Sequence, residues 1–126
     1  MKPVNTRLHG MLDYMSAFIL LLPWIMEFYT GGTDTKIFAA LGAATIVVSL
    51  CTDYEFGLLK FIPMKAHLVF DVISALFLMA MPWLFPVNHY TFYWPVLLGA
   101  GELLVVVLSS SSPYKYHRRD FNITVP

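Results

Sequence analysis

The chain has 126 residues, of which 58% are hydrophobic and 13% are charged; it fits one domain and is too apolar for an ordinary water-soluble fold. Its formal net charge is zero and no basic run alternates with aromatic residues, which argues against a nucleic-acid partner. Cys51 is the only cysteine, so neither an internal disulfide nor a CxxC redox pair can form. The composition predicts an integral membrane protein whose first partner is the lipid bilayer.

Four apolar segments approach the roughly 17 to 25 residues that a helix needs to cross a bilayer. In chain order they are residues 8–26, 35–52, 62–85 and 92–108. None alternates with period two over a long stretch, and an open sheet cannot satisfy its backbone in lipid, so all four are expected to be helices. The first resembles a signal peptide, but Asp13 interrupts it and a second copy occurs in mid-chain. We interpret it as a retained span.

The cationic residues are distributed unevenly between the two ends of these spans. Positively charged loops stay on the cytoplasmic side of a membrane. In a four-span arrangement Lys36 lies on one side, and the other side holds Lys2, Arg7, Lys60, Lys65, Lys115, Arg118 and Arg119. This asymmetry predicts that both termini are cytoplasmic.

The pattern of the first two spans recurs in the second half of the chain. Four residues of the first span recur in the same order and spacing in the third: His9, Asp13, Ser16 and Ala17 match His67, Asp71, Ser74 and Ala75. Pro23-Trp24 matches Pro82-Trp83, and residues 41–43 match residues 98–100. Each copy is a two-span hairpin, and an even number of spans makes the copies parallel. The prediction is an all-α membrane protein of four transmembrane helices in two tandem hairpin repeats.

The predicted boundaries follow from this repeat. Residues 1–126 form a single membrane domain, with repeat 1 at about 8–52, a cytoplasmic linker at about 53–61, repeat 2 at about 62–109 and a cytoplasmic tail at 110–126.

These features resemble the SPW-repeat family of small bacterial integral membrane proteins, whose hairpins carry a Ser-Pro-Trp signature near the end of the first helix. The resemblance covers nearly the whole chain. It rests on Pro23-Trp24, Pro82-Trp83, the two His-x-x-x-Asp segments and the linker from Thr52 to Lys65. Leu22 and Met81 stand where the signature has serine. The resemblance implies this architecture and a place in the bacterial inner membrane, and it implies no biochemical activity.

Several polar side chains fall inside the predicted spans. Helical spacing places three of them on one stripe of the first span and their repeat equivalents on one stripe of the third: His9, Asp13 and Ser16, then His67, Asp71 and Ser74. If the copies pack about a pseudo-two-fold axis, the stripes can face each other and form one shared polar site. Glu102 lies at a similar depth in the last span, where repeat 1 has Thr45. Three carboxyl groups are therefore expected in one layer.

An ionisable group at membrane depth costs at least about 2.5 to 3.5 kcal/mol, so these carboxyl groups need compensation. Bound protons, pairing with Arg7 or with the two histidines, water, and a bound cation such as zinc, manganese or iron are all open. In a purely structural alternative, each histidine hydrogen-bonds an aspartate and fixes helix packing. The sequence leaves both the cofactor and the binding of a metal undecided.

The two Pro-Trp pairs have a simpler interpretation. Pro23-Trp24 and Pro82-Trp83 lie near the predicted outer face, where tryptophan anchors a helix at the interface and proline bends or ends it. Small residues such as Gly42 and Gly99 in the second and fourth spans allow close approach of neighbouring helices.

The sequence contains no P-loop, GxGxxG, HExxH or GxSxG motif, so no catalytic residue is assigned and enzyme activity has no support. We expect small-solute, proton or ion handling through the polar layer. The alternative is a structural or assembly subunit that binds a partner membrane protein. A membrane oxidoreductase ranks below both. Self-association and a partner membrane protein are both left open.

Overall fold

The computed structural model describes residues 2–26, 32–87 and 92–112, without the side chains of residues 24–26. Within these ranges the chain forms four helices and no β-strand: α1 (Thr6–Met26), α2 (Thr33–Cys51), α3 (Met64–Leu84) and α4 (Tyr93–Leu108). Every helix end lies within two residues of a predicted span end. The all-helical class is confirmed.

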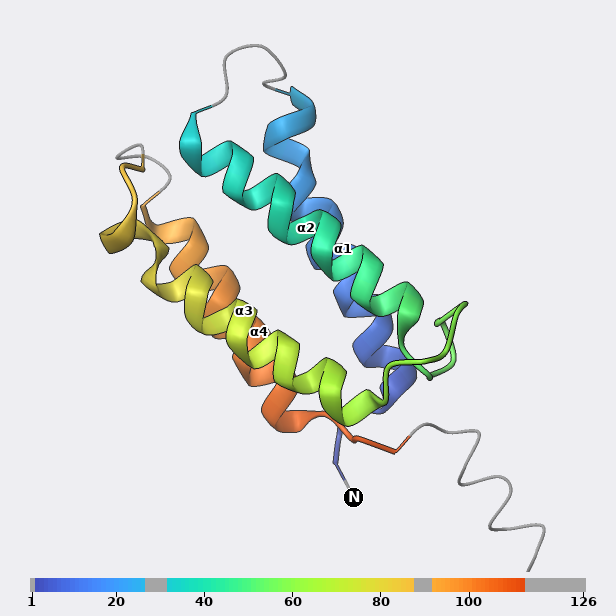
Figure 1. Ribbon diagram of the computed structural model, residues 1–126. Coiled ribbons are helices and arrows are strands. Elements are labelled where there is room, and N and C mark those ends of the chain that lie inside the picture. Colours follow the sequence, from blue (N-terminus) through green and yellow to red (C-terminus); the bar gives the residue numbers. More distant parts are fainter. Residues whose placement is uncertain (1, 27–31, 88–91, 113–126) are drawn as a thin grey trace, which may run out of the picture.

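The helices are arranged as two hairpins that lie side by side (Figure 1). One hairpin consists of α1 and α2, the other of α3 and α4, and each packs far more extensively within itself than against the other. The linker and the start of α1 lie at the same end of the molecule. The polar residues His9 and His67, in the first turns of α1 and α3, lie at this end between the two hairpins.

The starts and ends of the helices follow local sequence signals. At the start of α1 the side chain of Asn5 accepts a hydrogen bond from the Leu8 N–H at 2.8 Å, which caps one of the unpaired donors of the first turn. Pro63, in an extended conformation, precedes α3. Pro23 and Pro82 lie inside α1 and α3, a few residues before these helices end.

Two isolated backbone bridges repeat the internal symmetry of the chain. One joins Val4, before α1, to Ser109, after α4; the other joins Ile62, before α3, to Thr52, after α2. The hydrogen bonds correspond one to one: Val4 N–H to Leu108 O (3.1 Å) and Ser110 N–H to Val4 O (2.8 Å), against Ile62 N–H to Cys51 O (2.9 Å) and Asp53 N–H to Ile62 O (2.8 Å). The start of each hairpin is thus tied to the end of the other in the same geometry.

The linker, residues 53–61, folds back over the end of α2. The amides of Leu58 and Leu59 donate to the carbonyl of Leu50 at 2.7 and 3.0 Å, and Phe61 donates to that of Cys51 at 3.0 Å. These bonds satisfy carbonyl groups that a helix end leaves unpaired. At Gly57 a Cβ atom would collide with the carbonyl of Thr52, so the turn requires glycine there.

Close packing within each hairpin depends on equivalent glycines. A Cβ added at Gly42 would lie 2.9 Å from the carbonyl oxygen of Ala17, and one added at Gly99 would lie 2.5 Å from that of Ala75. The buried apolar core lies farther along the bundle and is formed by Leu20, Phe38, Leu78 and Met81.

Two helices, α2 and α3, are long and apolar enough to cross a membrane, and α4 is a shorter apolar helix. Many large apolar side chains point outward: Met11, Met15 and Phe18 on α1, Val69, Ile73 and Leu76 on α3, and Leu97, Leu104 and Val107 on α4 are all more than half exposed. A surface of this kind is unusual for a protein in water.

Candidate functional site

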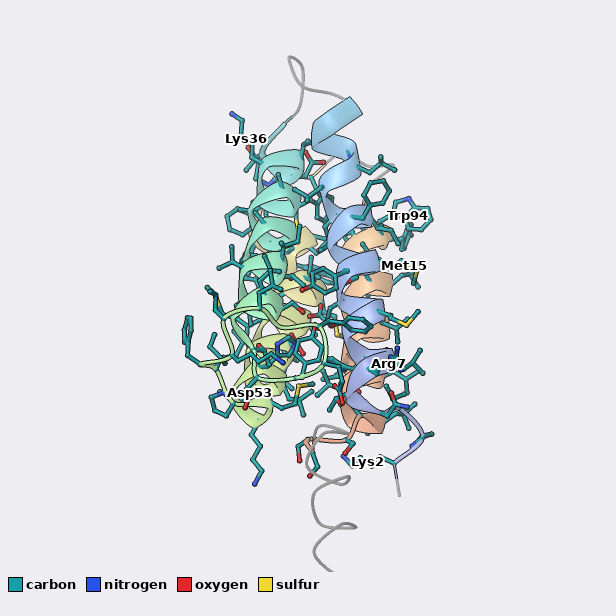
Figure 2. All side chains as sticks on the ribbon, turned by 90° about the vertical axis from the view of Figure 1, so that its right-hand side faces the viewer. Lys2, Arg7, Met15, Lys36, Asp53 and Trp94 are labelled. Atoms are coloured by element: carbon teal, nitrogen blue, oxygen red, sulfur yellow. The ribbon has the colours of Figure 1, made fainter. Side chains whose placement is uncertain are left out.

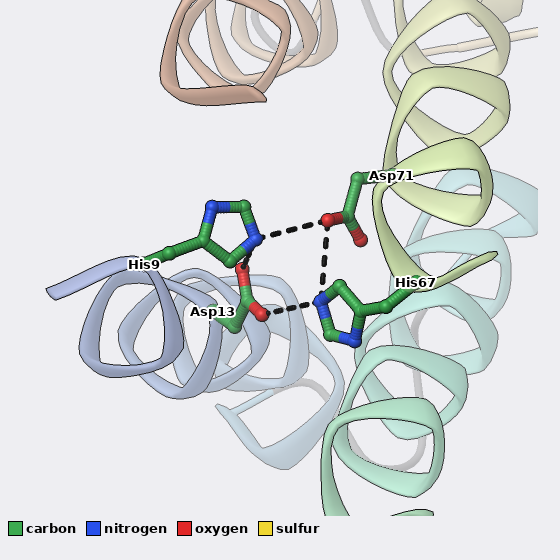
Figure 3. Close-up of side chains that lie close together, drawn as sticks. All are labelled: His9, Asp13, His67 and Asp71. Atoms are coloured by element: carbon green, nitrogen blue, oxygen red, sulfur yellow. Dashed lines mark hydrogen bonds and ion pairs between the residues drawn. The ribbon is translucent and has the colours of Figure 1, made fainter. Parts of the chain in front are cut away.

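The two His-x-x-x-Asp pairs meet between the hairpins and form a closed ring (Figure 3). His9 Nε2 lies 3.0 Å from Asp71 Oδ2 and 3.3 Å from Asp13 Oδ1. His67 Nε2 lies 2.8 Å from Asp13 Oδ2 and 3.2 Å from Asp71 Oδ2. All four residues are buried. We call this cluster the His/Asp ring.

The repeat positions the ring. His9 and His67 each occupy the fourth position of their helix, α1 or α3, and each aspartate follows its histidine by four residues on the same face. Each imidazole therefore contacts the aspartate of its own helix and that of the opposite helix. The two imidazole rings meet edge to face, with centroids 5.4 Å apart and planes at 71°. This is the approach of the two stripes that the repeat predicts.

The second nitrogen of each imidazole is held by a hydroxyl group. His9 Nδ1 lies 2.7 Å from Ser109 Oγ, and His67 Nδ1 lies 2.8 Å from Thr52 Oγ1. Both hydroxyls donate their own proton to a carbonyl four residues earlier, Ser109 to Val105 and Thr52 to Val48, each at 2.6 Å. Since a hydroxyl has one proton, each must accept from the histidine, and both Nδ1 atoms carry hydrogen.

This assignment restricts the charge state of the ring. Each Nε2 faces two carboxylates and either carries a second proton or presents a lone pair. If it presents a lone pair, a carboxyl proton or a metal ion must separate it from the carboxylate oxygens. Two imidazolium groups, two carboxyl protons or one divalent cation would each make the buried ring neutral. Neutrality is what burial away from water favours.

The two aspartates differ in their remaining contacts. Asp13 Oδ2 accepts a hydrogen bond from Ser49 Oγ at 3.3 Å. The equivalent of Ser49 in repeat 2 is Val106, which has no polar side chain. Asp71 Oδ1 is buried and has no hydrogen-bond partner among the described residues. Both carboxylate oxygens of Asp13 therefore have polar partners, whereas Asp71 has one oxygen without a hydrogen-bond donor among the described residues.

Tyr54 of the linker closes the ring on the Asp13 side. Its side chain is fully buried, its hydroxyl lies 2.8 Å from Ser49 Oγ, and its ring centroid lies 6.0 Å from that of His67. Burial raises the pKa of the Tyr54 phenol above its ordinary value, so it stays neutral. Gly10 makes room for it, since a Cβ there would collide with the tyrosine ring.

The other predicted polar residues lie outside the ring. Ser16 donates to the main-chain carbonyl of Asp13 at 2.9 Å. Ser74 is buried on α3, and no hydrogen bond among the described residues joins it to the ring. Glu102 lies half-buried on the inward stripe of α4 between Gly99 and Val106, and it makes no hydrogen bond or ion pair with a described residue. Of the three carboxyl groups expected in one layer, those of Asp13 and Asp71 contact the histidines directly, and that of Glu102 does not.

The Pro-Trp pairs lie away from the ring. Pro23 is half-buried in α1, and the side chain of Trp24 is outside the described residues. Pro82 is buried in α3, whereas the side chain of Trp83 is 69% exposed and packs edge to face on Phe92. An exposed tryptophan at a helix end suits an interfacial anchor.

Thr52, Ser109 and Tyr54 belong to the site but were not among the site residues predicted from the sequence. Thr52 and Ser109 end their hairpins at equivalent positions, with nearly identical backbone angles of φ −83°, ψ 141° and φ −86°, ψ 143°. Their equivalence in the repeat was the available signal. Tyr54 has no equivalent in repeat 2, so the repeat could not indicate it.

Comparison with protein-family models, with curated proteins and with solved structures gave no match. The site must therefore be interpreted from its own geometry.

Proposed function

We propose that this chain is a polytopic protein of the bacterial inner membrane that handles a small cation at the His/Asp ring. In this proposal all four helices cross the bilayer as two parallel hairpins, and both termini are cytoplasmic. The resemblance to the SPW-repeat family, the apolar helices α2 and α3 and the outward apolar side chains support this architecture. The distribution of cationic residues supports the orientation.

The observation that carries the functional proposal is the ring itself. Two aspartates and two histidines lie together in the interior, where each carboxylate would be costly unless a proton or cation compensates it. Intramembrane carboxyl groups that face one another in a bundle commonly mark ion and proton pathways. Asp71 Oδ1, a buried acceptor without a donor among the described residues, adds support because a proton or cation would complete its bonding.

Vesicle experiments test this function directly. Full-length protein is reconstituted into liposomes, and a gradient of protons or of a divalent cation is imposed. A dye inside the liposomes that responds to protons, or to the cation used, reports the flux. Wild type should dissipate a gradient faster than protein-free vesicles. Asp13→Asn and Asp71→Asn should lose this activity because each removes one ring carboxylate.

Asp53→Asn is the matched control, since it makes the same chemical change in the linker outside the ring. It should keep wild-type flux. If wild type is no faster than empty vesicles for every cation tried, cation handling is refuted.

A second candidate, a structural or assembly subunit, is favoured by two observations. The ring joins two hairpins whose helices pack far more extensively within each hairpin than between them, and α2 exposes small side chains at Ala40 and Ala43 that would allow another helix to pack closely. This candidate predicts that Ala43→Leu abolishes recovery of a partner or second copy after crosslinking in membranes, while ring variants retain it.

A further inference from the structure

We infer that the His/Asp ring is a tetrahedral zinc site. This inference rests on the proposed function, whose cation it identifies. His9 and His67 would bind through Nε2, and Asp13 and Asp71 through one carboxylate oxygen each. The ion would bridge the two hairpins.

The first support is geometric. The four potential ligand atoms, one from each residue, all lie within 4.8 Å of one another. Asp71 Oδ2 lies 3.0 Å from His9 Nε2 and 3.2 Å from His67 Nε2, whereas Asp13 offers Oδ2 to His67 Nε2 at 2.8 Å and Oδ1 to His9 Nε2 at 3.3 Å. A tetrahedral zinc ion with bonds of about 2.0 to 2.1 Å holds its ligand atoms about 3.3 Å apart. Three of these nitrogen-to-oxygen separations lie within about 0.3 Å of the tetrahedral value, and the shortest lies about half an ångström below it, so small side-chain adjustments would bring these donors to tetrahedral spacing.

The second support is the state of the imidazoles. A zinc-bound histidine normally donates its other ring N–H to a fixed acceptor, which sets the tautomer and aims the lone pair at the metal. Thr52 and Ser109 supply this acceptor in both repeats because their own protons are bonded to Val48 and Val105. Both Nε2 lone pairs are consequently directed into the ring.

The third support is charge and ligand type. Two carboxylates neutralise one divalent cation, so the occupied site carries no net charge in a region where charge is costly. Two nitrogen and two oxygen donors suit zinc, whereas magnesium and calcium prefer six or more oxygen ligands. With four ligands from the chain no coordination position is left for substrate, so the ion would be held or carried and would not serve as a hydrolytic centre.

The test uses purified, metal-stripped full-length protein in detergent, with zinc chloride as the probe. After desalting, elemental analysis should find one zinc per chain, and competition with a chromophoric chelator gives the affinity. Cobalt substitution should produce the intense visible absorption of a tetrahedral ion. Asp71→Asn and His67→Gln should lose zinc, while Asp53→Asn should retain it.

A second pair of variants keeps all four ligands. Thr52→Val removes the acceptor for His67 Nδ1, together with the hydroxyl's own bond to the Val48 carbonyl, and should weaken zinc binding about 10- to 100-fold. Ser16→Ala removes a hydroxyl of α1 that bonds main chain and should leave the affinity unchanged. Circular dichroism and gel filtration confirm that each variant is folded.

Absence of zinc from folded wild type, or equal zinc content in Asp71→Asn, would overturn the inference. Vesicle flux separates this result from failure of the proposed function. Proton flux without zinc binding refutes the zinc site and preserves cation handling. Zinc binding without any flux supports the zinc site as a fixed joint between hairpins and refutes transport.

Discussion

Asp13 and Asp71 occupy equivalent positions in the two repeats, but the hydrogen bonds that their carboxylates accept differ. Asp13 accepts a hydrogen bond from Ser49, and the corresponding place opposite Asp71 belongs to Val106. A buried acceptor without a donor costs about 1 to 3 kcal/mol. The asymmetry can therefore be tested by exchanging the side chains.

Ser49→Ala should lower the stability by about 2 kcal/mol because it leaves both Asp13 and the Tyr54 hydroxyl with one partner fewer. Val106→Thr replaces one methyl group with a hydroxyl of nearly the same size. It should raise the stability because Asp71 Oδ1 gains a donor. Thermal melting of the full-length protein in detergent measures both. A fall in melting temperature for Val106→Thr as large as that for Ser49→Ala would contradict this account of the ring.

At the level of residues, the site could be predicted from the sequence where the repeat carried the information. The two His-x-x-x-Asp pairs recur with helical spacing, and packing of the repeats about a pseudo-two-fold axis allows them to face each other. Tyr54 could not be found in this way, because its burial depends on how the linker folds back and on the absence of a side chain at Gly10. Glu102 shares the depth of the ring without contacting it, since depth in a span does not determine distance across a bundle.

Each hairpin is held together by a helix crossing that only glycine permits. At Gly99 the position of a Cβ atom would fall 2.5 Å from the Ala75 carbonyl oxygen and 2.7 Å from Met79 Cγ. At Gly101, two residues later on the same helix, no atom outside the local backbone lies within 4 Å. The two glycines thus provide a matched pair for substitution.

Gly99→Ala should destabilise the protein by about 1 to 3 kcal/mol, because α3 and α4 must separate to admit the methyl group. Gly101→Ala should leave the melting temperature unchanged or slightly raised, because alanine favours helix and meets open space. Equal effects of the two changes on thermal unfolding in detergent would show that the crossing is not glycine-dependent.

Helices were the most predictable elements of this chain. Their apolar runs, ended by Gly-rich or Pro-containing segments, predicted limits close to those in the structure. The linker was less predictable, since its path depends on hydrogen bonds to the last carbonyls of α2 and on Lys60, whose φ of 54° is rare for a residue with a side chain.

For the whole molecule, the distribution of charge predicts a defined orientation. Lys36 lies at one end of the bundle, and Lys2 and Arg7 lie at the other, together with Asp53 of the linker (Figure 2). Lys115, Arg118 and Arg119, which add to the second group, are outside the described residues. The end with more lysine and arginine should face the cytoplasm.

Reporter fusions measure this orientation. A reporter after Pro126 or before Met1 should behave as cytoplasmic, and one inserted near Gly31 or Asn88, also outside the described residues, should behave as external. The four-span arrangement would be refuted by cytoplasmic behaviour of either loop insertion.

The paired backbone bridges have a consequence for the origin of the fold. Val4 meets Ser109 as Ile62 meets Thr52, and His9 meets Asp71 as His67 meets Asp13. Reciprocal contacts of this kind are those of an isologous homodimer. A single ancestral hairpin could therefore have assembled the complete ring by pairing with a copy of itself. Fusion of two such copies would leave the halves free to differ, and Ser49, Tyr54 and Glu102 are positions at which they differ.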